Sequence, residues 1–254
     1  MGSLPSLRER YAEAARAGRP LLGGHRGNPA EHPENTLRSF ASALELGVDM
    51  IECDVHLSSD GELVVIHDHT LDRTTDGHGL VHAMTAAELR RLDAGGGERI
   101  PALSEVAELA RGRAGLIIET KQVAAIRYQG LEEKLVRVLA DADMLDQAAV
   151  ISFFHLSAKA VKELEPRLQV GIIEYGTPVD PVAVLRQARA DIYSPHFSGV
   201  DAEIVDQVHL AGGVVGVWVV NDAVAVAAVR AAAPDSVFSD RPREILRLLR
   251  DQGS

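Results

Sequence analysis

Short apolar segments alternate with helix-like segments along most of the chain, and this alternation limits the fold more than any other feature. Segments rich in Val, Ile and Leu begin near positions 21, 50, 116, 149, 170, 191, 214 and 236. Strands that alternate with helices form a parallel sheet, because each helix returns the chain to the start of the next strand. Eight such units within 254 residues predict a (β/α)8 TIM barrel.

One apolar segment, at 63–67, does not belong to this count. It follows Asp60-Gly61, a dipeptide that favours a tight turn between two antiparallel strands. We therefore expect a hairpin whose return arm lies outside the barrel and brings His67 beside Asp54. The polar stretch that follows, at 69–99, is too long for a plain connection. Residues 56–103 are expected to form a small hairpin and insertion after the second strand, which serves as a wall or lid over the active site.

Several helix boundaries are predicted from local signals. Residues 4–18 mix charged residues with alanines and predict a short amphipathic helix, not a signal peptide, because no apolar centre is present. Apolar residues at 37–44 recur at helical spacing, and Gly47 is the expected end of that helix. Ser104 is expected to cap a further helix at 105–111.

Composition and charge narrow the class of protein. Hydrophobic residues make up 46% of the chain and charged residues 25%, as in soluble globular domains. The net charge of −11 argues against a nucleic-acid partner. The longest apolar run is shorter than the roughly 18 residues of a membrane span, which argues against a stable membrane anchor. Because Cys53 has no second cysteine to pair with, we expect a reducing, cytoplasmic location.

Polar residues gather where the first three barrel strands are predicted to end. In a barrel of this kind the active site lies at the carboxyl ends of the strands. These ends carry His25 and Arg26 on the first strand, Glu52 and Asp54 on the second with His67 returned beside them, and Glu119 and Lys121 on the third. The convergence of these residues at three successive strand ends predicts a single polar site.

The residue types at these ends indicate metal-assisted chemistry on an anion. Three carboxylates offer hard oxygen ligands, which suit Mg²⁺, Ca²⁺ or Mn²⁺ better than zinc. The imidazoles of His25 and His67 are candidates for general acid and general base. Arg26 and Lys121 suit a substrate with anionic oxygens, such as a phosphate.

Some of these residues also fit a purely structural role. Lys121 can serve only to pair with Glu119. Trp218, the single tryptophan, fits either the core or an apolar wall beside the substrate. His196 fits either the surroundings of the site or simple packing, and His56 is left out of the candidate set.

The motifs, taken in order, resemble those of the glycerophosphodiester phosphodiesterases. They are H-R-G at 25–27, P-E-N-T at 33–36, I-E-x-D-V at 51–55, D-G-E-L-V-V-I-H-D at 60–68, L-D-R-T-T-D-G at 71–77, E-x-K at 119–121, S-F at 152–153, W-x-V-N at 218–221 and S-D-R-P at 239–242. Each motif is weak alone, but their order and spacing are specific, and the resemblance runs from about residue 20 to 245.

This resemblance implies a barrel of the phospholipase-C-like phosphodiesterase type, formed as a single catalytic domain by residues 1–254. It implies divalent-metal-dependent hydrolysis of glycerophosphodiesters to sn-glycerol 3-phosphate and an alcohol, with Mg²⁺, Ca²⁺ or possible Mn²⁺ as cofactor. By motif position, the metal ligands are Glu52, Asp54 and Glu119, the acid–base pair is His25 and His67, the phosphate ligands are Arg26 and Lys121, and the supporting residues of the substrate site are Glu34, Asn35 and Trp218.

Alternatives stay open within this resemblance. A related phosphodiesterase of the lysophospholipase D type, or one acting on sugar-phosphate diesters, fits the same motifs, and an inactive phosphodiester-binding barrel is the non-enzymatic alternative. The sequence leaves open the head group, the physiological metal, which histidine is the acid, and the oligomeric state. It also leaves open whether a glycerol hydroxyl or water attacks phosphorus. The third-strand motif reads E-T-K, where E-I-K or E-L-K is commoner in the family.

Overall fold

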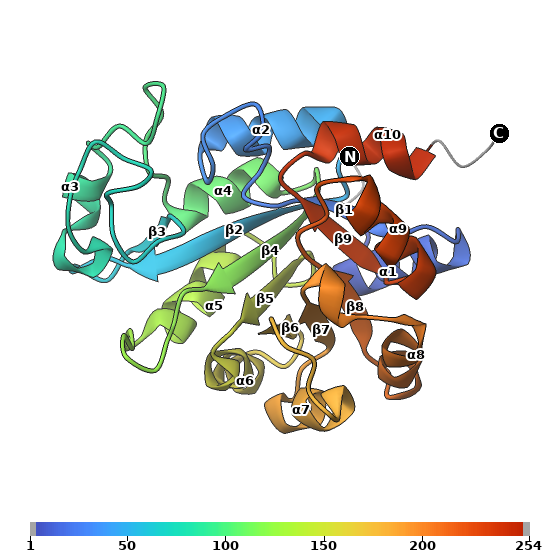
Figure 1. Ribbon diagram of the computed structural model, residues 1–254. Coiled ribbons are helices and arrows are strands. Elements are labelled where there is room, and N and C mark those ends of the chain that lie inside the picture. Colours follow the sequence, from blue (N-terminus) through green and yellow to red (C-terminus); the bar gives the residue numbers. More distant parts are fainter. Residues whose placement is uncertain (1–3, 251–254) are drawn as a thin grey trace.

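Eight parallel strands close into a barrel in the computed structural model, which describes residues 4–250 (Figure 1). The barrel strands are β1 (Leu21–Gly24), β2 (Met50–Leu57), β4 (Gly115–Thr120), β5 (Ala148–Ser152), β6 (Gln169–Glu174), β7 (Ile192–Pro195), β8 (Val214–Val217) and β9 (Ser236–Ser239). Each strand pairs with its neighbours in parallel, and β1 pairs with both β2 and β9, which closes the sheet. The predicted (β/α)8 barrel is therefore confirmed.

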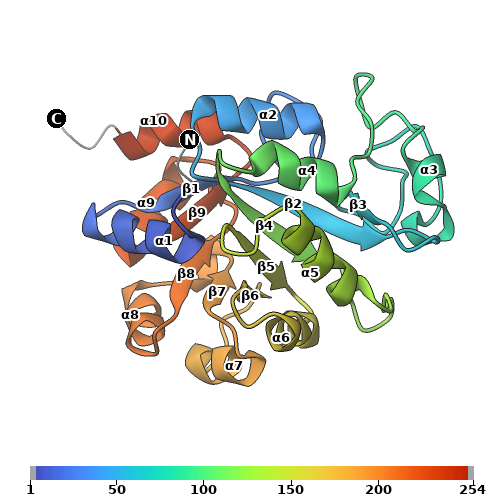
Figure 2. The same ribbon diagram turned by 180° about the vertical axis from the view of Figure 1, so that it is seen from behind.

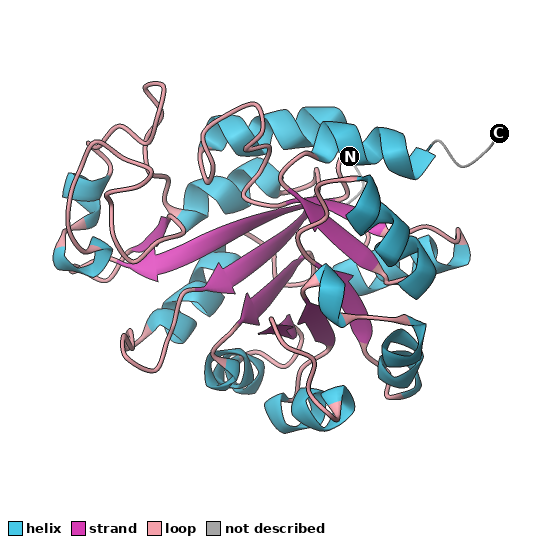
Figure 3. Ribbon diagram, viewed as in Figure 1, coloured by secondary structure: helices cyan, strands magenta, loops and turns pink. Residues whose placement is uncertain are grey.

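Helices surround the barrel and complete the alternation (Figure 3). They are α2 (Leu37–Leu46), α4 (Leu103–Ala110), α5 (Leu131–Asp141), α6 (His155–Leu164), α7 (Pro181–Ala188), α8 (Ala202–Leu210), α9 (Ala223–Ala232) and α10 (Pro242–Arg250). The largest apolar cluster lies between the outward-facing strand residues and these helices. No helix among residues 4–250 is both long enough and apolar enough to cross a membrane.

Capping explains where two of these helices begin and end. Helix α2 ends at Gly47 as predicted, with a φ of 78° in the left-handed region, which glycine adopts at little cost. The predicted cap at Ser104 is wrong, because α4 already begins at Leu103. The Glu105 carboxylate accepts a hydrogen bond of 2.8 Å from the backbone N–H of Ala102 and so fixes the earlier start.

The amino-terminal helix α1 (Leu7–Arg16) packs against the residues that fill the barrel at the amino ends of its strands, where the chain enters the sheet (Figure 2). Its buried residues Leu7 and Tyr11 lie in one apolar cluster with Leu21, Met50 and Ile117, which point into the barrel. This packing occupies the amino ends and leaves the carboxyl ends of the strands for a polar site.

The segment after β2 begins with the predicted hairpin. Strand β3 (Leu63–Val65) pairs antiparallel with β2, and the N–H of Ile66 donates to the carbonyl of Asp54 at 3.0 Å. The chain then passes through a short 3-10 helix, η1 (Val81–Ala83), and α3 (Ala86–Leu89). A small apolar cluster of its own holds this segment together beside the barrel, and it projects from one side of the molecule (Figure 1).

Candidate active site

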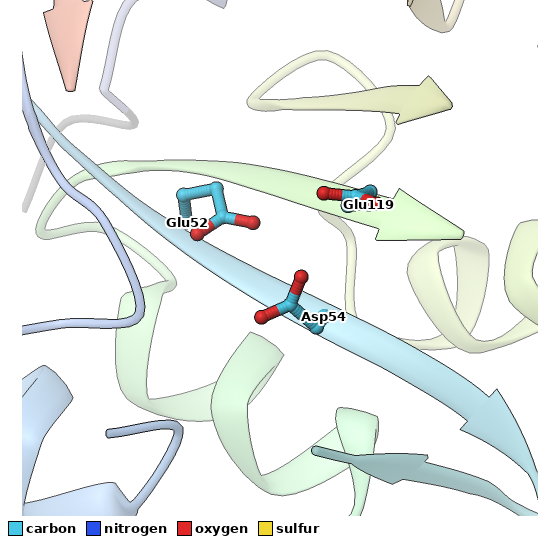
Figure 4. Close-up of side chains that lie close together, drawn as sticks. All are labelled: Glu52, Asp54 and Glu119. Atoms are coloured by element: carbon cyan, nitrogen blue, oxygen red, sulfur yellow. The ribbon is translucent and has the colours of Figure 1, made fainter. Parts of the chain in front are cut away.

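Three buried carboxylates converge inside the carboxyl end of the barrel. Glu52 and Asp54 lie two residues apart on β2 and therefore share its inner face, and Asp54 stands opposite Glu119 in the parallel register of β2 and β4. One ligand oxygen from each of the three residues lies within 4.8 Å of the others (Figure 4). The structure thus brings together the three predicted metal ligands.

Electrostatics of this cluster favour a bound cation. Burial, together with the nearby charge of Asp54, raises the pKa of Glu52 to about 8. Burial also raises the pKa of Glu119. Burial opposes ionisation of Asp54 as well, but the charges of Lys121 and Arg26 outweigh it and lower the pKa of that carboxyl. Three crowded carboxylates with hard oxygen atoms fit a divalent ion such as Mg²⁺, Ca²⁺ or Mn²⁺.

The two predicted phosphate ligands contact this acidic cluster directly. Lys121 Nζ lies 2.7 Å from Glu119 Oε1 and 2.8 Å from Asp54 Oδ1. The guanidinium Nε of Arg26 lies 3.4 Å from Asp54 Oδ2. The backbone N–H of Arg26 donates a hydrogen bond to the Glu52 carboxylate at 2.9 Å. The structural alternative for Lys121, pairing with Glu119, is therefore present, but the same ammonium also bridges to Asp54.

Each candidate acid–base histidine is held by a carboxylate on its Nδ1 atom. His25 Nδ1 lies 2.6 Å from Asp240 Oδ1, and His67 Nδ1 lies 2.6 Å from Asp68 Oδ1. An ionised carboxylate only accepts hydrogen bonds, so the Nδ1 atoms carry the protons and the Nε2 atoms remain for chemistry. His25 Nε2 lies 4.0 Å from the Glu52 carboxylate, at the edge of the acidic cluster.

The surroundings shift the basicity of the two imidazoles in opposite directions. For His25, burial lowers the pKa, but the carboxylates of Asp240 and Glu52 outweigh it and the net pKa is raised. For His67, burial together with the charges of Lys121 and Arg26 lowers the pKa. The two imidazoles therefore differ in their readiness to hold a proton, as an acid and a base working together must.

The carboxylate partners of the histidines, Asp68 and Asp240, have no role in the sequence prediction. Both lie inside quoted motifs, since Asp68 follows His67 and Asp240 belongs to S-D-R-P at 239–242. The structure also fixes these carboxylates in turn. Asn221 Nδ2 donates to Asp240 Oδ2 at 2.7 Å, and Arg73 Nε donates to Asp68 Oδ2 at 2.7 Å.

The supporting residues Glu34 and Asn35 contact the charged groups of the site. Glu34 accepts hydrogen bonds from Arg26 at 2.9 Å and from Arg73 at 2.8 Å, so it joins the loop after β1 to the insertion. Asn35 Nδ2 donates to Asp54 Oδ2 at 2.7 Å, and its backbone adopts a left-handed φ of 57°. The structure thus places Asn35 against a predicted metal ligand.

Aromatic side chains form the opposite arc of the same barrel end. Trp218 Nε1 donates to the carbonyl of Ser194 at 2.9 Å, which fixes the indole. Its ring centroid lies 5.5 Å from that of Phe153, 5.3 Å from His196 and 6.0 Å from Tyr175. Phe153 is 46% exposed and Tyr175 is 70% exposed. We call these four residues the aromatic rim; Trp218 also packs against the apolar cluster inside the barrel.

His56 belongs to the surroundings of the site although it is missing from the predicted set. It lies two residues beyond Asp54, so the alternation of a strand places it on the same inner face. It is fully buried, and its imidazole contacts the Tyr128 hydroxyl at 2.7 Å and the His67 carbonyl at 3.1 Å. Burial lowers the pKa of His56 to about 3, so the ring stays neutral.

Comparison with known proteins agrees with this geometry. The glycerophosphoryl diester phosphodiesterase family matches residues 25–244. A glycerophosphodiester phosphodiesterase of Caldanaerobacter subterraneus subsp. tengcongensis is 36% identical over 241 residues, which cover 92% of this chain and 99% of that protein. Another of the same name from Bacillus altitudinis is 34% identical over 234 residues, covering 88% and 96% of the two chains.

A solved structure provides a third comparison. An Oleispira antarctica phosphodiesterase in complex with the product sn-glycerol-3-phosphate aligns with a TM-score of 0.80 at 31% identity, covering 92% of this chain and 98% of that one. Both the match over most of the sequence and the shared barrel support one assignment. The chain belongs to the glycerophosphoryl diester phosphodiesterase family and is a phosphoric diester hydrolase.

Proposed function

We propose that this enzyme hydrolyses glycerophosphodiesters to sn-glycerol 3-phosphate and an alcohol, with a divalent metal ion and two histidines as the acid–base pair. The observation that carries the proposal is the pairing of each imidazole with a carboxylate beside one buried cluster of three acidic residues. The related Oleispira antarctica enzyme, whose structure contains sn-glycerol-3-phosphate, supports the identity of the product.

The metal would be held by Glu52, Asp54 and Glu119, whose oxygen atoms are close enough to share one ion. When bound, a divalent ion neutralises charge on the phosphate oxygens and so favours attack at phosphorus. Mg²⁺ and Ca²⁺ are the proposed ions, and Mn²⁺ has the same preference for oxygen ligands.

Arg26 and Lys121 are proposed to bind the non-bridging oxygens of the phosphodiester. Both cations already lie against Asp54, so they are fixed before substrate arrives. Fixed cations need little reorganisation as charge develops on phosphorus, and this preorganisation is the main source of electrostatic catalysis. Glu34 holds Arg26 from its far side, and Asn35 holds Asp54, which supports the same arrangement.

The two imidazoles are proposed to move protons at their Nε2 atoms. One withdraws a proton from the attacking hydroxyl, and the other donates a proton to the oxygen of the departing alcohol. Either a glycerol hydroxyl or water can act as nucleophile. Attack by the glycerol hydroxyl releases the alcohol first and gives a cyclic phosphate, which water must then open to glycerol 3-phosphate; ³¹P NMR of a single-turnover reaction would detect this cyclic species. Direct attack by water gives no such species.

The aromatic rim is proposed to contact the alcohol portion of the substrate. Phe153 and Tyr175 expose their rings on the arc opposite the acidic cluster, and Trp218 lies between them and the barrel. Aromatic faces bind apolar groups and alkylammonium groups better than polyols. Alcohols of these kinds are therefore expected to be preferred over sugars as leaving groups.

A coupled assay of glycerol 3-phosphate release tests the function and its alternatives together. Release from glycerophosphocholine and glycerophosphoethanolamine is the expected result. Release of choline from lysophosphatidylcholine, with no glycerol 3-phosphate released from any substrate, would favour a lysophospholipase D type activity. Turnover only of diesters that lack a glycerophosphate group would favour sugar-phosphate diesters. Tight binding of glycerol 3-phosphate without turnover of any substrate would favour an inactive binding barrel.

A further inference from the structure

A chain of hydrogen bonds lies beneath His67 and is not part of the reaction proposed above. His56 is the last inward-facing residue of β2 and is fully buried. Its Nε2 atom lies 3.1 Å from the His67 carbonyl oxygen, and its Nδ1 atom lies 2.7 Å from the Tyr128 hydroxyl. His56 thus contacts the main chain of His67, whereas Asp68 contacts the imidazole of that residue.

The chemistry of the partners fixes the direction of both hydrogen bonds. A carbonyl oxygen only accepts, so His56 Nε2 must carry the proton that it shares with His67. Neutral His56 then has a lone pair on Nδ1, and the Tyr128 hydroxyl must donate to it. The chain therefore runs in one direction, from Tyr128 through His56 to the carbonyl of His67.

Tyr128 is itself firmly placed. It lies in the connection between β4 and α5 and is 8% exposed. Its N–H donates to Gln122 Oε1 at 2.8 Å, and Gln122 Nε2 donates back to its carbonyl at 3.1 Å. Lys121 is the first residue of the connection that holds Tyr128. The hydrogen-bond chain therefore joins the end of β4 to the hairpin arm that carries His67.

The main chain at His67 needs such a support. The regular pairing of β3 with β2 ends before His67, and the N–H of Ile66 makes the last backbone hydrogen bond to β2 in this arm. Within residues 4–250, His56 is the hydrogen-bond donor that the structure gives to the His67 carbonyl. Removing the His56 side chain would leave the His67 carbonyl without this hydrogen bond. The main chain at His67 would then be less restrained, and its imidazole would be less well aligned with the acidic cluster.

We propose that His56 and Tyr128 are positioning residues that fix the main chain at His67, so that its imidazole stays aligned for proton transfer. The inference rests on the acid–base role proposed for His67. Neither residue contacts the carboxylates of the acidic cluster through a hydrogen bond or ion pair in the described part of the chain. Their loss should therefore reduce kcat and leave KM and metal affinity nearly unchanged.

Other histidines crowd the same place but do not change this conclusion. The His69 ring lies 4.8 Å from that of His56, and the His82 ring lies 6.1 Å from that of Tyr128. Among the residues that the structure describes, the acidic cluster is the single group of three or more His, Cys, Asp or Glu side chains close enough to hold a metal. His69 therefore packs against His56, and His82 packs against Tyr128, without forming a second metal centre.

Two matched pairs of variants test the positioning role. In H56Q the amide nitrogen reaches toward the His67 carbonyl, as His56 Nε2 does, whereas the shorter side chain of H56N does not. Y128F removes one hydroxyl from the chain, and Y193F removes a hydroxyl from another buried tyrosine, whose oxygen has no hydrogen-bond partner in the described chain. Steady-state kinetics with glycerophosphocholine at saturating metal, and thermal melting, are measured for each.

We expect H56N to lower kcat by about 10- to 100-fold, because small misplacements of a catalytic group have effects of that size. H56Q should recover most of this loss, Y128F should lower kcat less than H56N, and Y193F should have wild-type kcat. KM should change by less than about threefold throughout, since binding groups are untouched. If Y128F and H56N have wild-type kcat, or raise KM alone, the proposal is wrong. Because Y128F removes a single atom, it decides the matter even if H56N fails to fold.

A double-mutant cycle with H67A separates this inference from the proposed function. If His56 acts through His67, H56Q and H56N should have the same kcat once His67 is alanine. An equal loss in both backgrounds would show that His56 acts independently of His67 and would overturn the proposal. If H67A alone has wild-type kcat, the acid–base assignment fails, and this result is distinct from a failure of the His56 variants.

Discussion

Asp54 and Glu119 stand opposite each other across the parallel strands β2 and β4, and the ammonium of Lys121 contacts both carboxylates, at 2.8 Å and 2.7 Å. Two neighbouring strands therefore place two carboxylates at the same level of the barrel, and the residue just after β4 supplies the ammonium that contacts both. Glu52 adds a third carboxylate from the level below. On this arrangement rest the proposed metal site and the proposed phosphate-binding role of Lys121.

Neutralising one acid should separate metal binding from stability. Burial, together with repulsion from the neighbouring Asp54 carboxylate, raises the pKa of Glu52 to about 8. E52Q keeps the shape of the side chain and removes this repulsion, so the metal-free variant should melt at or above the wild-type temperature. Its turnover should fall by about 100-fold or more, because a metal ligand is lost. Melting in EDTA and turnover in excess metal measure the two effects. A variant that melts lower but turns over normally would contradict the assigned role.

Removing either of the two imidazoles proposed as the acid–base pair should abolish most activity and leave the fold intact. H25A and H67A should each lower kcat by about 100-fold or more, the usual contribution of a general acid or base. H209A is the matched control, because His209 also contacts a carboxylate, Asp235, at 2.8 Å, but lies at the end of α8, away from the acidic cluster. Circular dichroism checks the fold. Near wild-type turnover of H25A and H67A would rule out the assigned pair.

Asp240 should affect turnover by orienting the imidazole of His25, to which it is hydrogen-bonded. D240N replaces an acceptor with an amide that can donate to His25 Nδ1, and so favours the wrong tautomer of the ring. We expect kcat to fall by about 10- to 100-fold while KM changes little, because Asp240 is not a proposed substrate ligand. N221A should have a smaller effect of the same sign, since Asn221 only orients Asp240. Equal kcat for D240N and wild type would show that His25 does not depend on this carboxylate.

Alkaline stability should depend on Tyr11 in α1. Burial raises the pKa of Tyr11 to about 12, above the value of about 10 that a free tyrosine has. The Tyr11 hydroxyl therefore loses its proton at a lower pH in the unfolded chain than in the folded protein. Its contribution to the free energy of unfolding is present below pH 10 and is lost as the pH rises toward 12. Y11F should unfold with a shallower alkaline decline, by about 2 kcal/mol over this interval. Urea unfolding at several pH values measures it, and parallel declines would contradict the prediction.

The sequence was sufficient for the barrel because its signal is local. Each strand is a short apolar segment, each is followed by a helix, and Asp60-Gly61 identified the hairpin that leaves the barrel. The prediction that Ser104 caps α4 failed because the start of a helix depends on which hydrogen bonds its first backbone N–H groups can form. The Glu105 carboxylate accepts a hydrogen bond from the backbone N–H of Ala102, and the sequence pattern alone does not reveal this contact.

The site was predicted to the extent that its residues lie in short motifs. Pairings between distant segments could not be predicted. His25 and Asp240 meet across the closure of the barrel, and Tyr128 reaches His56 from the next strand's connection. Such contacts depend on the three-dimensional arrangement, although the alternation of β2 already placed His56 on the face of Asp54.

Release of glycerol 3-phosphate from glycerophosphocholine, followed with and without EDTA, tests the central claim most directly. The proposal predicts rapid release by the wild-type enzyme, loss of that activity in EDTA, and recovery when Mg²⁺, Ca²⁺ or Mn²⁺ is added back in excess. The ion that restores the greatest turnover identifies the preferred metal. Full activity in EDTA would contradict a metal site at Glu52, Asp54 and Glu119, and absence of glycerol 3-phosphate with every metal would contradict the proposed reaction.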